Sequence, residues 1–562
     1  MEVEQEFLNW DAENIDIIKN EADKILNRKI SNIEDLKCLI FDFESFVDHI
    51  QENATRIHVK FTANTTDKEV EKKYNYISHE IYPILSLISE RFDTKVLESE
   101  FADKLDDDRF GIFIKRMKMS KKTFNKENIP INTQIKDLFN KYSKIVSSLT
   151  INYKDSEITM RQAAVMLENP DREIREEIWK KIAKKRASVA EEVDVIFDNM
   201  VELRNNIALN SNYKNFTDYS FDDKYRFDYN ADMCREFHSS IEKNIVPLLR
   251  KIFLNKKSKL NLKQLKPWDL GVDVYGKDEI KVFDNINEFL PKVKSVFEQI
   301  SPEFAEFFQK MLYKGYVDLI NRKGKAPGAY QTSFKEEKMP FIFSNMLGVL
   351  KDMGTIFHES GHAYHFMKSR HRRPFVHPGS EMAEVASFAM EIFGLHYANP
   401  AILDSETHKR ASIRHFEGVV RIFPWVAKVD AFQLWVYENP KATAKERRIY
   451  WRSLEERFDT GVVDYEDFDY FRYTNWQAQH HIFKAPFYYI EYAIAQLGAL
   501  QLWKNSLRNF NKTIVEYSNG LSFGGSRSLP ELYRKTGIKF DFSEEVVKDV
   551  AILLEKKLNE IW

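Results

Sequence analysis

The sequence has 562 residues, of which 43% are hydrophobic and 14% aromatic, with only 18 Gly and 16 Pro. This hydrophobic content excludes a disordered chain, and the scarcity of Gly and Pro favours long helices over the many short strands of a sandwich or barrel. The net charge of −2 lacks the electrostatic signature of a protein that binds nucleic acid or an anionic membrane. Two cysteines and an acidic N-terminus without a signal-peptide pattern indicate a cytoplasmic protein. We therefore expect a mostly α-helical globular fold.

The N-terminal third shows amphipathic helical patterns separated by short polar turns. After residue 69, apolar residues recur every three or four positions, as on one buried helix face: Val70, Tyr74, Ile77, Ile81, Leu85 and Ile88. Asn169-Pro170 is typical of a helix start, with Asn169 as the N-cap. The chemically informative motifs all follow this point. We therefore predict an N-terminal helical lobe, residues 1–170, and a second helical region, residues 171–562, that carries the candidate chemistry.

Residues 324–348 interrupt the helical pattern. The runs GKAPGAYQTSF and PFIFSNMLG are short, aromatic and bounded by Gly and Pro, so they predict strands or extended segments. These segments could form a small hairpin that caps the core. Because they directly precede the main motif, they could instead line a cleft, where Gly328, Ala329 and Tyr330 would pair with the backbone of a bound peptide.

The most specific motif is HExxH, at residues 358–362. Positions i and i+4 of a helix lie on one face, so His358 and His362 can ligate the same metal ion. Glu359 then lies beside that pair and can accept a proton from a metal-bound water. In a chain with 14 His, the expected number of accidental matches is on the order of a few hundredths. The motif therefore predicts a zinc site with a water-activating glutamate.

A catalytic zinc site needs a third protein ligand and one open position. One known scheme uses a His ten residues after the first, but that position holds Lys368. The other scheme uses a carboxylate from a following helix, and the run SEMAEVASFAMEIF supplies one, with Ser380 as the expected N-cap. Of its residues Glu381, Glu384 and Glu391 we prefer Glu384, which has apolar neighbours and lies where the helix dipole favours the ionised carboxylate. Spacing alone leaves Glu381 as a rival.

A mainly apolar segment near the C-terminus carries polar ring tips, on His480, His481, Tyr488, Tyr489 and Tyr492. These rings could form an ordinary aromatic core cluster, in which the buried hydroxyl groups would need partners. Alternatively, a His and one or more of the tyrosines could face the metal and donate hydrogen bonds to an oxyanion. Both interpretations agree with the sequence pattern.

Taken together, these motifs make the sequence resemble a known family. HESGH, followed by AEVAS on the next predicted helix, is similar to the thimet oligopeptidase and oligoendopeptidase F family of zinc metallopeptidases. Further runs resemble its oligoendopeptidase branch, of the Pz-peptidase type: GKAPGAYQTSF, PFIFSN, HIFKAPFYYIEYAIAQLGALQLW and GGSRSLPELYRKTGI. The matching runs lie within residues 318–537, and DREIREEIW, near residue 171, is a weaker match.

The resemblance implies one zinc ion, with Glu384 as its third ligand beside His358 and His362. It also implies an almost entirely helical, clam-like fold, in which two lobes close around a deep substrate channel with a small β element at the cleft. A channel of this kind would admit short unfolded peptides and exclude folded proteins.

The resemblance further implies that a His and tyrosines of the C-terminal segment stabilise the tetrahedral intermediate. We assign this role to His481 and Tyr492, with Tyr489 next, and a substrate contact to Tyr488. The expected function is a zinc-dependent oligoendopeptidase with Glu359 as general base and short peptides, rather than nucleic acid or membrane, as partners. The alternatives are a zinc carboxypeptidase or dipeptidyl peptidase of related fold, and a non-catalytic helical binding protein.

Overall fold

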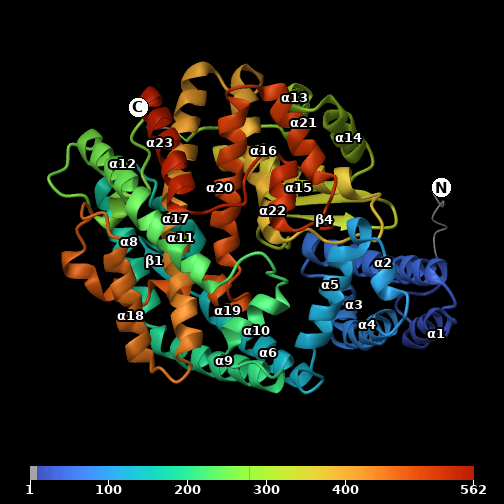
Figure 1. Cartoon of the computed structure of the whole chain (residues 1–562). Coiled ribbons are helices and arrows are strands. Elements are labelled where there is room, and N and C mark those ends of the chain that lie inside the picture. Colours follow the sequence, from blue (N-terminus) through green and yellow to red (C-terminus); the bar gives the residue numbers. More distant parts are fainter. Residues whose placement is uncertain (1–8, 277–278) are drawn as a thin grey trace. The chain divides into compact units, whose positions relative to one another are not determined.

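The computed structural model describes residues 9–276 and 279–562, and the fold is mainly helical, as predicted (Figure 1). The chain forms two compact units, each assembled from three separate segments. Unit 1 is Met1–Lys122, Ile280–His408 and Gly498–Phe540, and unit 2 is Thr123–Glu279, Lys409–Leu497 and Asp541–Trp562. The predicted lobe boundary is instead a single cut between residues 170 and 171. It stays a prediction.

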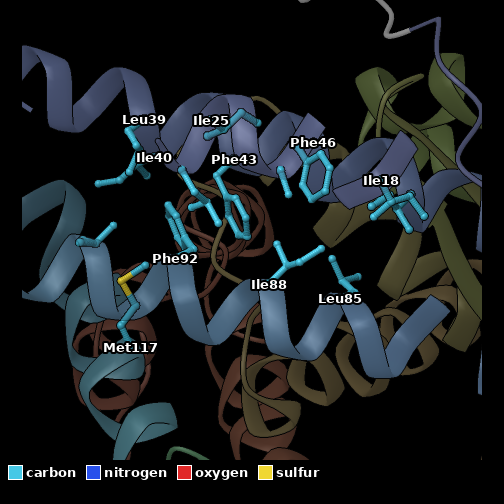
Figure 2. Packing of buried hydrophobic residues seen from close by; sticks show 14 of the residues in the cluster. Ile18, Ile25, Leu39, Ile40, Phe43, Phe46, Leu85, Ile88, Phe92 and Met117 are labelled. Carbon is cyan, nitrogen blue, oxygen red and sulfur yellow. The ribbon is translucent and has the colours of Figure 1, made fainter. Parts of the chain in front are cut away.

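The N-terminal segment of unit 1 is a group of packed helices. Their bounds are Ile15–Leu26 (α1), Ile33–Ala63 (α2), Lys68–Tyr76 (α3), Tyr82–Leu97 (α4) and Asp107–Thr123 (α5), with a π-helical stretch Ile77–Ile81 (η1) and a 3-10 turn Ala102–Lys104 (η2). The apolar faces meet in one buried cluster, where the rings of Phe43 and Phe92 stack with centroids 3.8 Å apart (Figure 2). The predicted apolar stripe is confirmed in this cluster, which buries Ile77, Ile81, Leu85 and Ile88.

Unit 1 also contains a small sheet of strands Val317–Ile320 (β3), Tyr330–Phe334 (β4) and Met339–Met346 (β5), in the order β3-β5-β4. Strands β4 and β5 form an antiparallel hairpin in which Tyr330 pairs with Phe343, whereas β3 runs parallel to β5. Every residue of the central strand β5 is buried. The extended segments predicted within residues 324–348 are therefore strands, and the hairpin packs against helix α15 (Leu350–Ser369; Figure 1).

Helix α15 packs closely against helix α16 (Ser380–Ala401). Gly361 of α15 permits this approach, because a Cβ atom there would lie 2.5 Å from Cα of Ser387 and 2.6 Å from the carbonyl oxygen of Ala386. A larger residue would push the two backbones apart. The remaining helices of unit 1 are Ile286–Ile300 (α13), Pro302–Tyr313 (α14), Phe510–Leu521 (α21) and Leu529–Lys535 (α22).

Unit 2 is likewise mainly helical. Its α-helices are Asn128–Ser147 (α6), Met160–Met166 (α7), Arg172–Ala187 (α8), Ala190–Asn210 (α9), Phe216–Asp223 (α10), Ala231–Asn244 (α11), Val246–Lys259 (α12), Ala444–Arg457 (α18), His480–Lys484 (α19) and Glu544–Ile561 (α23). Shorter elements are the strands Thr150–Tyr153 (β1) and Ser156–Thr159 (β2) and the 3-10 turns Pro267–Asp269 (η3), Glu466–Tyr473 (η4) and Asn475–Ala478 (η5). Helices Ser405–Glu438 (α17) and Tyr489–Ser506 (α20) include residues of both units. Among the described residues, the helices all fall short of the length and apolar character that a membrane crossing requires.

Two predicted helix starts are wrong by one or two residues. Helix α8 begins at Arg172, and its N-cap is Asp171, whose carboxylate accepts a backbone N–H of the first turn. Asn169 instead accepts the backbone N–H of Asp171 at 2.8 Å, so it shapes the turn before the helix. Helix α16 begins at Ser380 itself and follows Gly379 as the cap residue. In both places the cap is a neighbouring residue with a non-helical backbone, as a cap requires.

Candidate active site

The histidines of the HExxH motif lie one turn apart on α15, with ring centroids 5.0 Å apart. Both rings approach Glu384 of α16. Its Oε2 atom is 3.4 Å from Nε2 of His358 and 3.7 Å from Nε2 of His362. One donor atom from each of the three residues lies within 4.8 Å of the others. The i, i+4 spacing therefore produces the shared face that the sequence predicted, and a carboxylate from the next helix meets it.

Glu384, rather than Glu381, is the carboxylate that lies with the two histidines. Oγ of Ser387 donates a hydrogen bond of 3.0 Å to Oε2 of Glu384, which holds this carboxylate from one turn further along α16. Glu381 lies one turn earlier, where its carbonyl oxygen accepts a hydrogen bond from the Tyr533 hydroxyl. Within residues 9–276 and 279–562, the donor atoms that converge in this manner belong to His358, His362 and Glu384.

Glu391, the last of the three carboxylates considered as the third ligand, also belongs to this site. Its Oε1 atom lies 2.6 Å from Nδ1 of His358, so it holds the ring with Nε2 directed toward Glu384. The backbone of Ala383 favours the protonated form of His362, against the larger opposing effect of burial. The spacing in the sequence could have predicted this role, because Glu391 lies two helical turns after Glu384 and therefore on the same face of α16.

The electrostatics of the site favour a cation. Burial disfavours the protonated form of His358, but Glu391, by hydrogen bond and charge, and the charges of Glu384 and Glu359 outweigh it and raise the pKa to about 9. Burial raises the pKa of Glu359 to about 7, against the lowering effect of His358. Burial and the charge of His358 hold the pKa of His362 well below its usual value, so this ring is neutral, the form that binds metals. Carboxylates beside neutral imidazole nitrogen suit a divalent ion such as zinc.

Three of the predicted substrate-contact residues lie at β4: Tyr330 is its first residue, and Gly328 and Ala329 directly precede it. Gly328 and Ala329 are exposed, and the φ of +101° at Gly328 is a conformation that suits glycine. Nδ2 of Asn345, on β5, donates hydrogen bonds to the carbonyl oxygens of Ala326 and Gly328, at 2.8 and 2.9 Å. This segment is therefore exposed but held in shape.

Tyr330 and Gln331 connect the same strand to its surroundings. The Tyr330 hydroxyl lies 2.6 Å from Oγ1 of Thr62 on α2, and its ring stacks on Phe343, so the side chain is part of the packing of unit 1. The backbone N–H of Gln331 is a hydrogen-bond donor that lowers the pKa of Glu359. Strand β4 therefore contacts the HExxH helix at its glutamate.

In unit 2, His481 and the predicted tyrosines form one aromatic cluster. The ring centroid of His481 is 6.0 Å from that of Tyr488, 4.9 Å from that of Tyr489 and 5.8 Å from that of Tyr492. Tyr489 is buried, and the other three rings are half-buried. The adjacent His480 is exposed and packs edge-on against Tyr142 instead, at 5.4 Å. The structure therefore groups His481, and not His480, with the tyrosines.

The turn that assembles this cluster has an unusual backbone. Phe487, between α19 and α20, has a φ of +62°, a left-handed conformation that bulky side chains rarely adopt. Its N–H donates a 2.9 Å hydrogen bond to Oε1 of Gln433, and its carbonyl oxygen accepts one from Arg226. Arg226 also forms a buried ion pair with Glu491 of α20, at 2.7 Å. Such a conformation costs about 1–3 kcal/mol and persists only where surrounding contacts stabilise it. The contacts of Phe487 and Arg226 therefore fix the backbone from which the tyrosine side chains project.

The chain matches the description Peptidase family M3 over residues 165–552 and Peptidase M3 N-terminal domain over residues 8–124. The first match alone covers more than half of the chain. The protein therefore belongs to peptidase family M3, and the resemblance seen in its motifs is confirmed.

Individual relatives agree with this assignment. Oligopeptidase PepF of Bacillus subtilis (strain 168) is 22% identical over 420 residues, which cover 72% of this chain and 60% of that protein. The oligoendopeptidase F homolog of Borreliella burgdorferi is 23% identical over 450 residues, which cover 75% and 72%. The solved structure of Pz peptidase A with inhibitor 2 is similar over 99% of both chains, with 28% identity and a TM-score of 0.89. The match to PepF thus spans less than two thirds of its length, whereas the match to Pz peptidase A is nearly complete.

Proposed function

We propose that the protein is a zinc-dependent oligoendopeptidase, which hydrolyses internal bonds of short unfolded peptides. The observation that carries this proposal is the convergence of His358, His362 and Glu384, with Glu359 next in sequence to His358, in a chain of peptidase family M3. The names of the relatives, an oligopeptidase and an oligoendopeptidase F homolog, support peptides as the substrate class.

The donor set fits one zinc ion, because two imidazole nitrogens and one carboxylate oxygen leave a further position open. When bound, zinc supplies a Lewis acid that lowers the pKa of a water molecule towards about 7. Glu391 orients the ring of His358, and Ser387 orients the Glu384 carboxylate. These contacts hold the donor atoms in position before a metal ion binds.

Glu359 acts as the general base. It takes a proton from water as the water oxygen adds to the scissile carbonyl carbon, and it then gives this proton to the leaving amine nitrogen. Burial raises the pKa of Glu359 above its usual value, which favours a carboxylate that can take a proton and return it near neutral pH.

His481 and Tyr492, with Tyr489 beside them, donate hydrogen bonds to the oxyanion that forms on the scissile carbonyl. The close contacts of the His481 ring with the tyrosine rings support this assignment. One well-placed donor of this kind contributes about 3–4 kcal/mol to the stability of the transition state.

Substrate binding is assigned to the start of β4 and to Tyr488. β4 is at an edge of the order β3-β5-β4, and an edge strand can pair with the backbone of an extended peptide. Tyr330 begins this edge strand, and Gly328 and Ala329 directly precede it. Since backbone pairing does not read side chains, we expect broad sequence tolerance. The two-lobed shape, the deep channel and the cytoplasmic location stay predictions.

The test of this function is cleavage of a defined peptide mixture by the purified protein, with and without a chelator, followed by mass spectrometry. We expect internal cleavage that the chelator abolishes and added zinc restores. A peptide blocked at both ends should be cleaved as well, because an endopeptidase does not need free termini. Cleavage confined to free termini would indicate a carboxypeptidase or dipeptidyl peptidase, and the absence of any product would favour a binding protein.

Replacing Glu391 should weaken metal binding without unfolding the protein. In Glu391→Ala, the ring of His358 loses the acceptor at Nδ1, and we expect a metal affinity about 10–100-fold lower. Glu391→Gln is the matched control, because its amide oxygen can still accept the Nδ1 hydrogen, and it should recover most of the affinity. Competition with a chelator of known affinity measures both variants. An unchanged affinity of Glu391→Ala would remove Glu391 from the metal site.

Tyr492→Phe should lower kcat by about 100-fold and leave KM nearly unchanged, because the hydrogen bond that it removes strengthens only in the transition state. Tyr142→Phe, which removes a hydroxyl that donates to the carbonyl oxygen of Gln477 outside the tyrosine cluster, serves as the comparison. Steady-state kinetics on one peptide provide both constants. A rise in KM with unchanged kcat would assign Tyr492 to packing or substrate binding instead.

A further inference from the structure

Three side chains of unit 2 form a hydrogen-bonded chain that ends on His481. Nε1 of Trp425, on α17, donates to Oε1 of Gln479 at 3.0 Å. Nε2 of Gln479 in turn lies 2.7 Å from Nδ1 of His481. Trp425 and Gln479 are 54 residues apart in sequence, so only the fold brings this chain together.

The donors and acceptors along this chain are determined by chemistry. An indole N–H can only donate, so the atom of Gln479 that faces Trp425 has to be the amide oxygen. The amide NH2 group then faces the imidazole and donates to Nδ1 of His481. A ring nitrogen that accepts a hydrogen bond carries no proton, so the neutral ring has its proton on Nε2.

We propose that Gln479 is a positioning residue, which holds His481 in the tautomer whose Nε2–H can donate to the oxyanion. This inference rests on the proposed function, in which His481 is such a donor. In the other tautomer Nε2 would be an acceptor, and its lone pair would repel the negative oxygen. Trp425 contributes indirectly, because it prevents the Gln479 amide from turning around.

The surroundings keep this chain in place. Gln479 is the N-cap residue of α19, where its N–H donates to the carbonyl oxygen of Trp476 at 2.9 Å and its own carbonyl oxygen accepts from Ile482 at 3.1 Å. The Trp425 ring packs edge-on against Trp451, with centroids 5.7 Å apart. In the described part of the chain, Nε2 of His481 has no hydrogen-bond acceptor from the protein, so its proton is available to a bound molecule.

The charge state of His481 agrees with this assignment. Burial lowers the pKa of the ring, and the nearby charges of His480 and Lys484 lower it further. The ring is therefore neutral near neutral pH, when the choice between its two tautomers matters. The titratable side chains that face it are His480, Lys484, Tyr488, Tyr489 and Tyr492.

Two variants of Gln479 test the proposal by kinetics. The carboxylate of Gln479→Glu accepts but does not donate, so it should move the ring proton to Nδ1 and lower kcat about 100-fold above the pKa of the ring, with KM nearly unchanged. The ratio of variant to wild-type kcat should rise as pH falls, because an imidazolium donates from both nitrogens. Gln479→Met, which cannot donate and accepts only weakly, should show a smaller loss and a ratio that stays flat with pH. A flat ratio or an unchanged kcat for Gln479→Glu would overturn the proposal.

A second measurement reads the tautomer directly and needs no substrate. In full-length protein with 15N-labelled histidine, the signal of His481 is assigned from its absence in His481→Gln. We expect an unprotonated Nδ1 in the wild type and a protonated one in Gln479→Glu. A protonated Nδ1 in the wild type would overturn the proposal. A wild type that shows the expected tautomer but cleaves no peptide would instead contradict the proposed function, so the two failures are distinguishable.

Discussion

The Glu359→Gln variant should bind metal like the wild type and cleave peptides about 1,000-fold more slowly. The substitution keeps the size and shape of the side chain but removes the carboxylate that takes the proton from water. His358, His362 and Glu384 keep their donor atoms, so the metal content should not change. The loss should therefore appear in kcat at full metal occupancy.

Elemental analysis of metal content and steady-state kinetics on one peptide measure this prediction together. Glu303→Gln is the matched control, because Glu303 is an exposed carboxylate in the same unit that pairs with Lys368 at 2.9 Å. It should retain full activity. Cleavage by Glu359→Gln at near wild-type rates would show that the base is another group.

The parts of the site that the sequence predicted depend on local geometry. The positions of His358, Glu359 and His362 relative to one another follow from the helical repeat alone, because residues four apart share a face. The strands within residues 324–348 were likewise predictable from short aromatic runs bounded by Gly and Pro. The mainly helical fold followed from composition and periodicity, which report on the local backbone.

The choice between Glu381 and Glu384 could not be made from spacing. The two residues lie on adjacent parts of one helix surface, and either could face a neighbouring helix. The packing of α15 against α16 decides between them, and this packing depends on the contact of Gly361 with the backbone of Ser387. Sequence periodicity does not reveal which residue of one helix meets which residue of the next.

The contacts that orient the site residues could not be predicted from the sequence pattern either. Glu391 of α16 forms a hydrogen bond with His358 of the neighbouring helix α15, a contact between residues 33 positions apart. The sequence also could not show which of His480 and His481 lies with the tyrosines. The two residues are adjacent and of the same type, so only their neighbours in the fold distinguish them. A helix start depends mostly on neighbouring residues, yet the predicted N-cap Asn169 is wrong and the observed N-cap is Asp171. Both residue types are good caps, and only the backbone conformation selects between them.

The largest effect on metal binding is expected from Glu384. In Glu384→Ala the site keeps two imidazole nitrogens and loses its anionic donor. Metal affinity should therefore fall by more than the roughly 100-fold that loss of a residue orienting a ligand, such as Glu391, can cause. The variant should be isolated with little metal and without peptidase activity. Because His358 and His362 are untouched, a high concentration of added zinc should restore part of the metal content.

Glu381→Ala is the matched comparison for Glu384→Ala, since it removes the same group from the same helix one turn earlier. The hydrogen bond from the Tyr533 hydroxyl ends on the backbone carbonyl of Glu381 and survives the substitution. We therefore expect wild-type metal content in Glu381→Ala, measured by elemental analysis beside Glu384→Ala. Thermal unfolding separates the two possible causes of a loss, because a variant that loses metal through the site itself should regain stability when zinc is added in excess. If Glu381→Ala lost the metal and Glu384→Ala kept it, the rival assignment that spacing left open would be the correct one.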